Sequence, residues 1–237
     1  MARGHPDYAK SVGYAKEGVL LQEYSIPPVW WMDDFSEPQS KWEEIEGTVA
    51  LKTVATMSGN TLSPLTSANM LYCTTAAGGD FSLNRKIGSF PHNSNVGFEI
   101  NFAIGKYQDF EDIENSLIVI YASVSVLPYD YELAITYNPR DGNWYYLKDS
   151  ECNYALISNH WVEDGSWCYV KLLINPITKE YLQLQINNKV YDLSGIPYPL
   201  FSTADYDYCQ FMIYGSSAAG KQIEVVFDHY VITYGES

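Results

Sequence analysis

Strict alternation of apolar and polar side chains over short segments constrains this chain more than any other feature of its sequence. In the segment 98–104 every second residue is apolar, namely Phe98, Ile100, Phe102 and Ile104. Successive side chains of a β-strand point to opposite faces, so this period of two predicts a strand with one buried face. The same reading predicts further strands over 131–137, 144–147, 167–174, 181–186, 189–193, 209–214 and 223–233.

Turn-forming residues separate these segments. Asn, Pro, Asp and Gly fill 138–143 and 175–178, and Asn187-Asn188 is a two-residue hairpin signal. No segment has the period of a long helix. The aromatic fraction of 15% supplies large side chains for a core. Many short antiparallel strands with one apolar face each must pack as a sandwich or a barrel, so the sequence predicts an all-β domain.

The first 29 residues differ from the rest and are interpreted as an N-terminal arm, with one β-sandwich domain over 30–237. The arm is polar and ends in Pro27-Pro28, which cannot sit in a central strand. Trp30 and Trp31 follow, and their rings should point to opposite faces of a strand. At most one would then enter the domain's own core, leaving the other to anchor a neighbouring subunit.

This interpretation predicts an oligomer that depends on the arm, with Tyr8, Tyr14 and Tyr24 as further contacts. The alternative is an arm that wraps its own sandwich and covers a sheet edge.

Charge excludes several partners. The chain has 14 basic and 29 acidic residues, for a net charge of −15. Such a surface repels the phosphates of nucleic acids and anionic membranes. No apolar run approaches the length of a membrane span, and the N-terminus lacks the apolar stretch of a secretory signal. We therefore expect a soluble protein made in the cytosol, acting in a virion or outside the cell after release.

The four cysteines form no C-x-x-C pair, which argues against a zinc ribbon or a dithiol redox site. Cys168 and Cys209 share the parity of apolar neighbours and are predicted to lie in the core. Cys73, Cys152 and these two are expected to be reduced, and a Cys168–Cys209 disulfide is the alternative.

Several segments together resemble the concanavalin A/laminin G-like jelly-roll superfamily, including uncharacterised modules encoded by phages and prophages. They are Asp33-Asp34-Phe35-Ser36 with Trp42, Gly47 to Leu51, Asn143 to Leu147, Trp167 to Leu172, Asn187 to Leu193 and Phe227 to Ile232. The resemblance covers residues 30–234 and implies an antiparallel jelly-roll β-sandwich. It does not choose a function, because the superfamily includes lectins, glycosidases, lyases, adhesion modules and virion proteins.

The acid cluster Asp109, Glu111, Asp112 and Glu114 is the one local pattern with catalytic potential. Retaining glycosidases of the superfamily carry a pattern like E-x-D-x-x-E, whereas this chain has D-x-E-x-x-E. We interpret the cluster mainly as a solvated loop, with a calcium site or a catalytic site as the alternatives. The four histidines lie far apart in sequence and none has metal-ligand spacing. We therefore expect a protein that is not an enzyme and needs no cofactor.

An aromatic face is the stronger candidate for binding. Trp167, Tyr169 and Lys171 lie opposite the core parity of their strand, and Gln183 and Gln185 match them on the hairpin partner. Trp144 and Tyr146 are expected on a nearby strand, as part of the same face. Flat rings beside amides suit a sugar, whose apolar face stacks while its hydroxyls bond. The alternative is a face covered by the arm, a loop or another subunit.

The leading functional prediction is a non-catalytic structural or assembly protein, such as a capsid-surface or tail-associated module of a phage virion. Its partners would be its own subunits or other virion proteins, reached through the arm. A carbohydrate-binding module is the second prediction, and a glycoside-active enzyme is the third.

Overall fold

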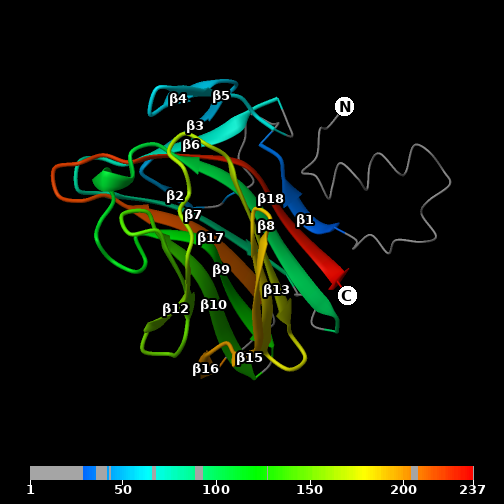
Figure 1. Cartoon of the computed structure of the whole chain (residues 1–237). Helices are drawn as coiled ribbons and strands as arrows, with labels where there is room; N and C mark the ends of the chain where they lie inside the picture. The colour runs from blue at the N-terminus through cyan, green and yellow to red at the C-terminus, as the bar shows by residue number, and fades with distance from the viewer. Residues whose placement is uncertain are drawn as a thin grey trace.

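Two antiparallel β-sheets packed face to face make up most of the described part of the chain (Figure 1). The computed structural model describes residues 29–35, 42, 44–65, 68–88, 93–126, 128–203 and 208–236. Within them the only helical element is the short 3-10 helix η1, Tyr107–Asp109. The predicted all-β sandwich is confirmed.

The first sheet, called sheet A, contains eight strands. They are β1 (Val29–Asp33), β3 (Thr48–Lys52), β6 (Met70–Thr74), β8 (Asn95–Ile104), β13 (Cys168–Asn175), β14 (Glu180–Ile186), β15 (Lys189–Pro197) and β18 (Glu224–Glu236). Their order across the sheet is β15-β14-β13-β8-β18-β6-β3, and β1 pairs with β18 beyond the end of β6.

The second sheet, sheet B, also contains eight strands. They are β2 (Glu44–Glu46), β7 (Asp80–Ile87), β9 (Leu117–Val126), β10 (Tyr129–Asn138), β11 (Asn143–Leu147), β12 (Tyr154–Asn159), β16 (Leu200–Thr203) and β17 (Tyr208–Ser216). Their order is β12-β11-β10-β9-β17-β7-β2, with β16 paired to the start of β10. A separate hairpin, β4 (Ala55–Met57) and β5 (Asn60–Leu62), completes the strands.

The predicted inner faces meet between the sheets. Phe98, Ile100, Phe102 and Ile104 of β8 are all fully buried in the main core cluster. Across the core, Ile135 of β10 is equally buried, as the alternation predicts. Each such side chain stabilises the fold by about 1.5–3 kcal/mol relative to exposure, so the period of two sets which face each strand turns inward.

The outer face of β8 is also buried, which the alternation alone did not predict. Glu99 and Asn101 are 4% and 3% exposed, and Ala103 is fully buried. Around Ala103, the β4–β5 hairpin supplies Met57, and together with Val226 of β18 these form a second apolar cluster. A hairpin distant in sequence thus covers one end of the outer face of sheet A.

Cysteine placement agrees with the reduced state. Cys168 and Cys209 are buried, as predicted, and so is Cys73. All four cysteines are free, which rules against the alternative Cys168–Cys209 disulfide in this structure. Cys152 differs from the others because it is exposed, in the turn that precedes β12.

The prediction that at most one of Trp30 and Trp31 packs into the domain's own core is wrong. Both side chains are partly buried and pack against the main core cluster. The Trp31 ring lies 4.6 Å from Phe211 and 5.9 Å from Trp42, measured between centroids. Pairing with β18 shifts register between Val29 and Trp31, and such a bulge breaks the simple alternation on which the prediction relied.

Residues 1–28, with Tyr8, Tyr14 and Tyr24, lie outside the described residues, so the arm and its contacts stay predictions. The described residues contain no helical segment that could span a lipid bilayer.

Candidate functional site

The outer face of sheet A carries most of the predicted aromatic face. Pairing places Tyr169 opposite Asn101, and Lys171 lies between Glu99 on one side and Gln185 on the other. Gln183 lies two residues before Gln185 on β14 and pairs with Leu173. The structure therefore brings Tyr169, Gln183 and Gln185 to one face, as the sequence indicated.

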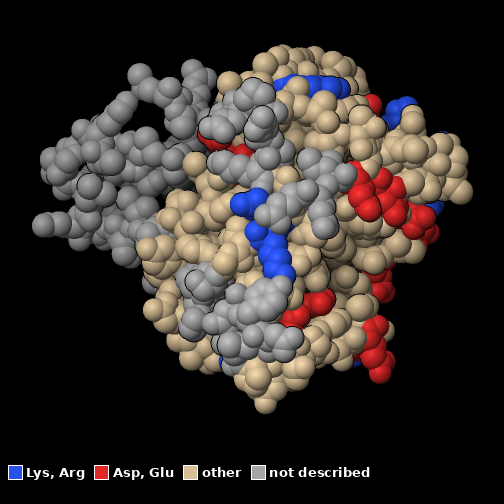
Figure 2. All heavy atoms as spheres, turned by 180° about the vertical axis from the view of Figure 1, so that it is seen from behind, with Lys and Arg blue, Asp and Glu red and all other residues tan. Residues whose placement is uncertain are grey.

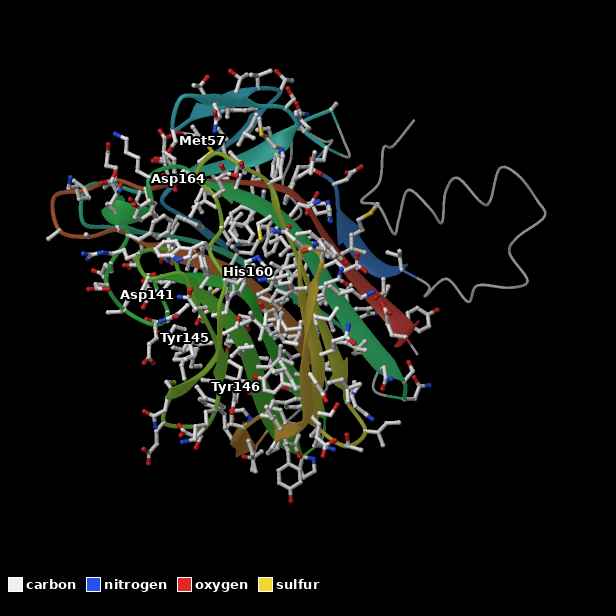
Figure 3. The ribbon with its side chains drawn as sticks, in the orientation of Figure 1. Met57, Asp141, Tyr145, Tyr146, His160 and Asp164 are labelled. Carbon is white, nitrogen blue, oxygen red and sulfur yellow. The ribbon has the colours of Figure 1, made fainter. Side chains whose placement is uncertain are left out.

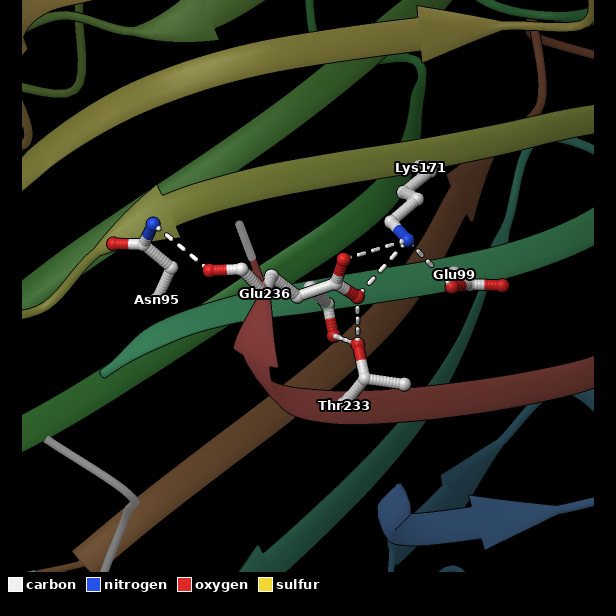
Figure 4. Close-up of polar contacts among 6 residues, drawn as sticks. Asn95, Glu99, Lys171, Thr233 and Glu236 are labelled. Carbon is white, nitrogen blue, oxygen red and sulfur yellow. Dashed lines mark hydrogen bonds and ion pairs between the residues drawn. The ribbon is translucent and has the colours of Figure 1, made fainter. Parts of the chain in front are cut away.

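Much of this face is engaged within the protein. Figure 4 shows the Lys171 ammonium between two carboxylates, with Nζ 3.0 Å from Glu99 Oε1 and 2.9 Å from Glu236 Oε1. Thr233 also donates its hydroxyl to Glu236. At the other end, the Trp167 indole donates to the carbonyl of Ser63 at 3.3 Å. This end matches the alternative interpretation, in which a loop covers the face.

Trp144 and Tyr146 do not belong to this face, contrary to the prediction. They lie on β11 of sheet B and point into the core, because they pair with the inward residues Tyr137 and Ile135. Trp144 is fully buried, with its ring 4.7 Å from that of Tyr137. Aromatic residues occupy both faces of β11, so their spacing could not reveal which of them face inward.

The acid cluster lies where the loop interpretation put it, in the segment from η1 to the start of β9. Asp109 Oδ1 is 3.6 Å from Lys221 Nζ, and Asp112 Oδ2 is 3.9 Å from Arg140 Nη1. Across the residues that the structure describes, no three His, Cys, Asp or Glu side chains gather in a way that could hold a metal ion. The calcium alternative therefore gains no support from Glu111, Glu114 or their neighbours.

Two members of the cluster instead line an open pocket of about 490 Å³ on the outer side of sheet B. We call it the Tyr145 pocket. Its lining comes from the segment before β9, the end of β10 and the turn after it, β11, and the turn into β12 with the first residue of that strand. The lining residues are Asp112, Ile113, Glu114, Asn115, Asn138, Asp141, Tyr145, Cys152 and Tyr154. Figure 3 shows Asp141 and Tyr145 together at this edge of the molecule. The sequence interpretation missed Asp141, Tyr145 and Tyr154.

Local hydrogen bonds build the β10–β11 side of the pocket. The backbone NH and the side-chain amide of Asn143 donate to the two oxygens of Asp141, at 2.8 and 2.9 Å. Gly142 has a φ of +74°, and a Cβ there would meet the Trp161 ring at 2.7 Å. Both the backbone conformation and the packing therefore require glycine at this turn.

The segment before β9, which forms another part of the pocket lining, is also held in place. Thr136 of β10 donates its hydroxyl to the carbonyl of Glu114 at 2.7 Å, which ties the segment before β9 to the sheet. The pocket is thus built by a turn and a loop that are both fixed to sheet B.

Tyr145 gives the pocket a directed donor. The residue is 9% exposed, and its hydroxyl accepts a hydrogen bond from Asn143 Nδ2 at 3.2 Å. No described residue accepts the proton of that hydroxyl. Burial, followed by the negative charges of Asp141, Glu114 and Asp112, raises the pKa of Tyr145, against the opposing effect of the Asn143 hydrogen bond. The phenol therefore stays protonated and can donate to a ligand.

A second polar group lies further along the same outer face. Asp130 accepts hydrogen bonds from the hydroxyls of Ser123, Ser125 and Tyr208 at 2.9, 3.0 and 3.1 Å. Burial and then Asp130 raise the pKa of Glu132, although a hydrogen bond from Tyr121 opposes the shift. Thr136 lies six positions after Asp130 on β10, or about 20 Å along a strand.

Half-buried aromatic side chains connect these two polar regions. The aromatic Tyr121, Tyr154, Phe201 and Tyr214, together with Met212, pack around the buried Ile118, Ala134 and Leu147 on this face. Tyr154 also lines the Tyr145 pocket, and burial raises its pKa to about 12. The outer face of sheet B is therefore a tyrosine-rich surface with carboxylates and hydroxyls at both ends.

No protein-family model matches this chain, and no curated protein matches its sequence. Solved structures show a distant likeness. A carbohydrate esterase of the Shiga toxin-encoding bacteriophage phi24B is 11% identical, with a TM-score of 0.49 over 89% of this chain and all of that one. The carbohydrate recognition domain of Emp47p is 11% identical, with a TM-score of 0.46 over 92% and 93% of the two chains.

The alginate lyase Aly36B is 12% identical, with a TM-score of 0.46 over 70% of this chain and 81% of that one. Likenesses this distant carry no argument about what this chain binds or does. The site must therefore be judged on its own chemistry.

Proposed function

We propose that this chain binds carbohydrate and that the Tyr145 pocket holds the sugar. The observation that carries the proposal is a nearly buried phenol with an unused proton, in an open pocket among carboxylates and amides. Each sugar hydroxyl both donates and accepts, so its site needs acceptors and donors together. Asp141 and Glu114 supply acceptors, Asn138 and Asn115 supply both, and Tyr145 supplies a donor.

Aromatic surface beside the pocket supports the same function. The apolar faces of a sugar ring stack on flat aromatic groups, and Tyr154 stands at the edge of both the pocket and the aromatic surface of sheet B. The proposal moves carbohydrate binding from the outer face of sheet A to that of sheet B. On sheet A, Glu99 and Lys171 form an ion pair with each other, and the Trp167 indole donates a hydrogen bond to the carbonyl of Ser63.

Binding without cleavage is the second part of the proposal. Within the acid cluster, Asp109 faces Lys221 and Asp112 faces Arg140. Asp112 and Glu114 line the pocket. The cluster is thus divided between ion pairs and a binding surface, and it does not form one constellation. Release of reducing sugar by the wild type, abolished by Glu111→Gln with Glu114→Gln, would contradict this part.

The direct test is a glycan array, followed by calorimetric titration of the glycans that bind. Tyr145→Phe removes one hydroxyl, and losing one hydrogen bond worth about 1 kcal/mol should weaken binding about fivefold. Tyr129→Phe, at an exposed tyrosine near the start of β10, is the matched control and should bind like the wild type. An array without a single bound glycan, or a Tyr145→Phe variant with unchanged affinity, would contradict the proposal.

An assembly role, as a capsid-surface or tail-associated module, stays a prediction from the sequence and its resemblance. In the described part of the chain, Trp30 and Trp31 both pack against the protein's own core, so neither supports the expected intersubunit anchor. Light scattering on the full chain and on a version starting at Val29, which keeps β1, tests whether the arm drives oligomerisation.

A further inference from the structure

The charged residues that line the Tyr145 pocket are all acidic. Its lining residues include the carboxylates of Asp112, Glu114 and Asp141 but no lysine or arginine. Arg140 lies at the rim, where its Nη1 is 3.9 Å from Asp112 Oδ2 and both side chains are well exposed. Figure 2 shows acidic side chains gathered along the edge of the molecule that bears η1 and the loop after it. An exposed ion pair of this length does little to offset two further carboxylates.

These carboxylates act on the Tyr145 hydroxyl, the group that the proposed ligand would contact. Asp141, Glu114 and Asp112 all contribute to the raised pKa of Tyr145, after the larger effect of burial. A ligand atom that accepts the Tyr145 proton would therefore sit among three negative charges. Because the phenol is 9% exposed and lines the pocket, a ligand that reaches it through the pocket passes these carboxylates.

We infer that the Tyr145 pocket selects sugars that carry an amine or no charge, and rejects sugars that carry a carboxylate, including uronic and sialic acids. The inference rests on the proposed function and specifies its ligand class. A sugar ammonium would pair with the acceptors Glu114, Asp112 or Asp141. A sugar carboxylate would find only uncharged donors in the lining, namely the Tyr145 hydroxyl and the asparagine amides.

The size of the preference follows from Coulomb's law. One carboxylate about 7 Å from a unit charge in water changes the affinity about threefold. Two or three carboxylates together should therefore favour an ammonium sugar over a carboxylate sugar by about tenfold or more at low salt. Raising the salt to 1 M shortens the screening length to about 3 Å, which should remove most of the difference.

The experiment compares three tetrasaccharides of equal length, made of glucosamine, N-acetylglucosamine and galacturonate, by calorimetric titration of the full chain. At pH 6 the amines are charged and the uronates are ionised. We expect the glucosamine tetramer to bind about tenfold more tightly than the galacturonate tetramer in 20 mM salt, with the neutral tetramer between them. Equal or tighter binding of the galacturonate tetramer would overturn the inference while leaving carbohydrate binding intact.

Charge-neutralising variants locate the effect. Asp112→Asn with Glu114→Gln removes two exposed lining charges and should reduce the preference by at least about threefold. Glu163→Gln, at an exposed glutamate outside the pocket lining, is the matched control and should keep the full preference. A double variant with an unchanged preference would overturn the inference. If none of the three tetramers binds and the glycan array is also empty, the proposed function fails and the inference fails with it.

Discussion

Lys171 and Glu99 face each other across the β13–β8 pair, with Nζ 3.0 Å from Oε1 and side chains only 15% and 5% exposed. The second carboxylate that contacts Lys171 belongs to Glu236, the last residue of β18 (Figure 4). Burial lowers the pKa of Lys171, but Glu99 and Glu236 more than offset it, so the net shift is upward. The outer face of sheet A is therefore held by charge at the point where three strands meet.

Replacing Lys171 by Met should destabilise the fold by about 3 kcal/mol, because it leaves two buried carboxylates without their cation. Lys189→Met, at an exposed lysine on β15, should change stability by less than about 0.5 kcal/mol. Urea unfolding at pH 7 measures both. The contribution of Lys171 should be full below pH 10.5 and lost as the pH rises through its elevated folded-state pKa. A Lys171→Met variant as stable as the wild type would contradict the structure.

Trp31→Ala should destabilise the domain by about 2–3 kcal/mol, because the ring packs against Phe211, Trp42 and Tyr230. Val29→Ala, at the exposed start of β1, should be nearly neutral. Thermal unfolding measures stability, and analytical ultracentrifugation of the same samples measures assembly. Loss of an oligomer at unchanged stability would instead favour the intersubunit role predicted from the sequence.

Thiol labelling should distinguish one cysteine from the other three. Burial strongly raises the pKa of the Cys73, Cys168 and Cys209 thiols, so they are both inaccessible and protonated. Ellman's reagent at pH 8 should modify only the exposed Cys152 in the native protein. After unfolding without reductant, all four should react. Two reactive thiols in the unfolded, unreduced chain would show that a disulfide forms.

Glu132→Gln should stabilise the protein more at neutral pH than at acidic pH. Burial and Asp130 raise the pKa of Glu132, so its stabilising contribution is present below the unfolded pKa near 4.5 and is lost as the pH rises through the folded value. The gain at pH 7 relative to pH 4 should stay below about 1 kcal/mol, because water screens this half-buried group. Glu151→Gln, at an exposed turn, is the control. An equal effect of Glu132→Gln at both pH values would contradict the shift.

The strands were predictable because their cause is local. Alternation along 98–104 reports which side chains the chain must bury, and Phe98 and Ile100 are buried for that reason. Asn187-Asn188 likewise predicts a hairpin, and Asn187 adopts a φ of +51°, which asparagine tolerates well. The acid cluster was recognised as a loop from its position between two strands.

The location of the site could not be predicted in this way, because it does not depend on near neighbours in the sequence. Trp144 and Tyr145 are adjacent aromatic residues on β11, and the alternation there cannot say which of them faces inward. Pairing with Tyr137 buries Trp144, while Tyr145 turns to the outer face and into the pocket. Trp31 was misjudged for a related reason, because a bulge in the β1–β18 pairing is decided by the partner strand.

Local patterns therefore predicted the all-β class, the most regularly alternating strands and the inner face of β8, since burial of alternate apolar side chains depends only on near neighbours in the chain. Tertiary structure alone decided that Asp112, Glu114, Asp141 and Tyr145 line one pocket. These residues come from separate segments, and what joins them is the register of β9, β10 and β11 within sheet B. Register is set by cooperative packing of whole strands, which no local pattern encodes.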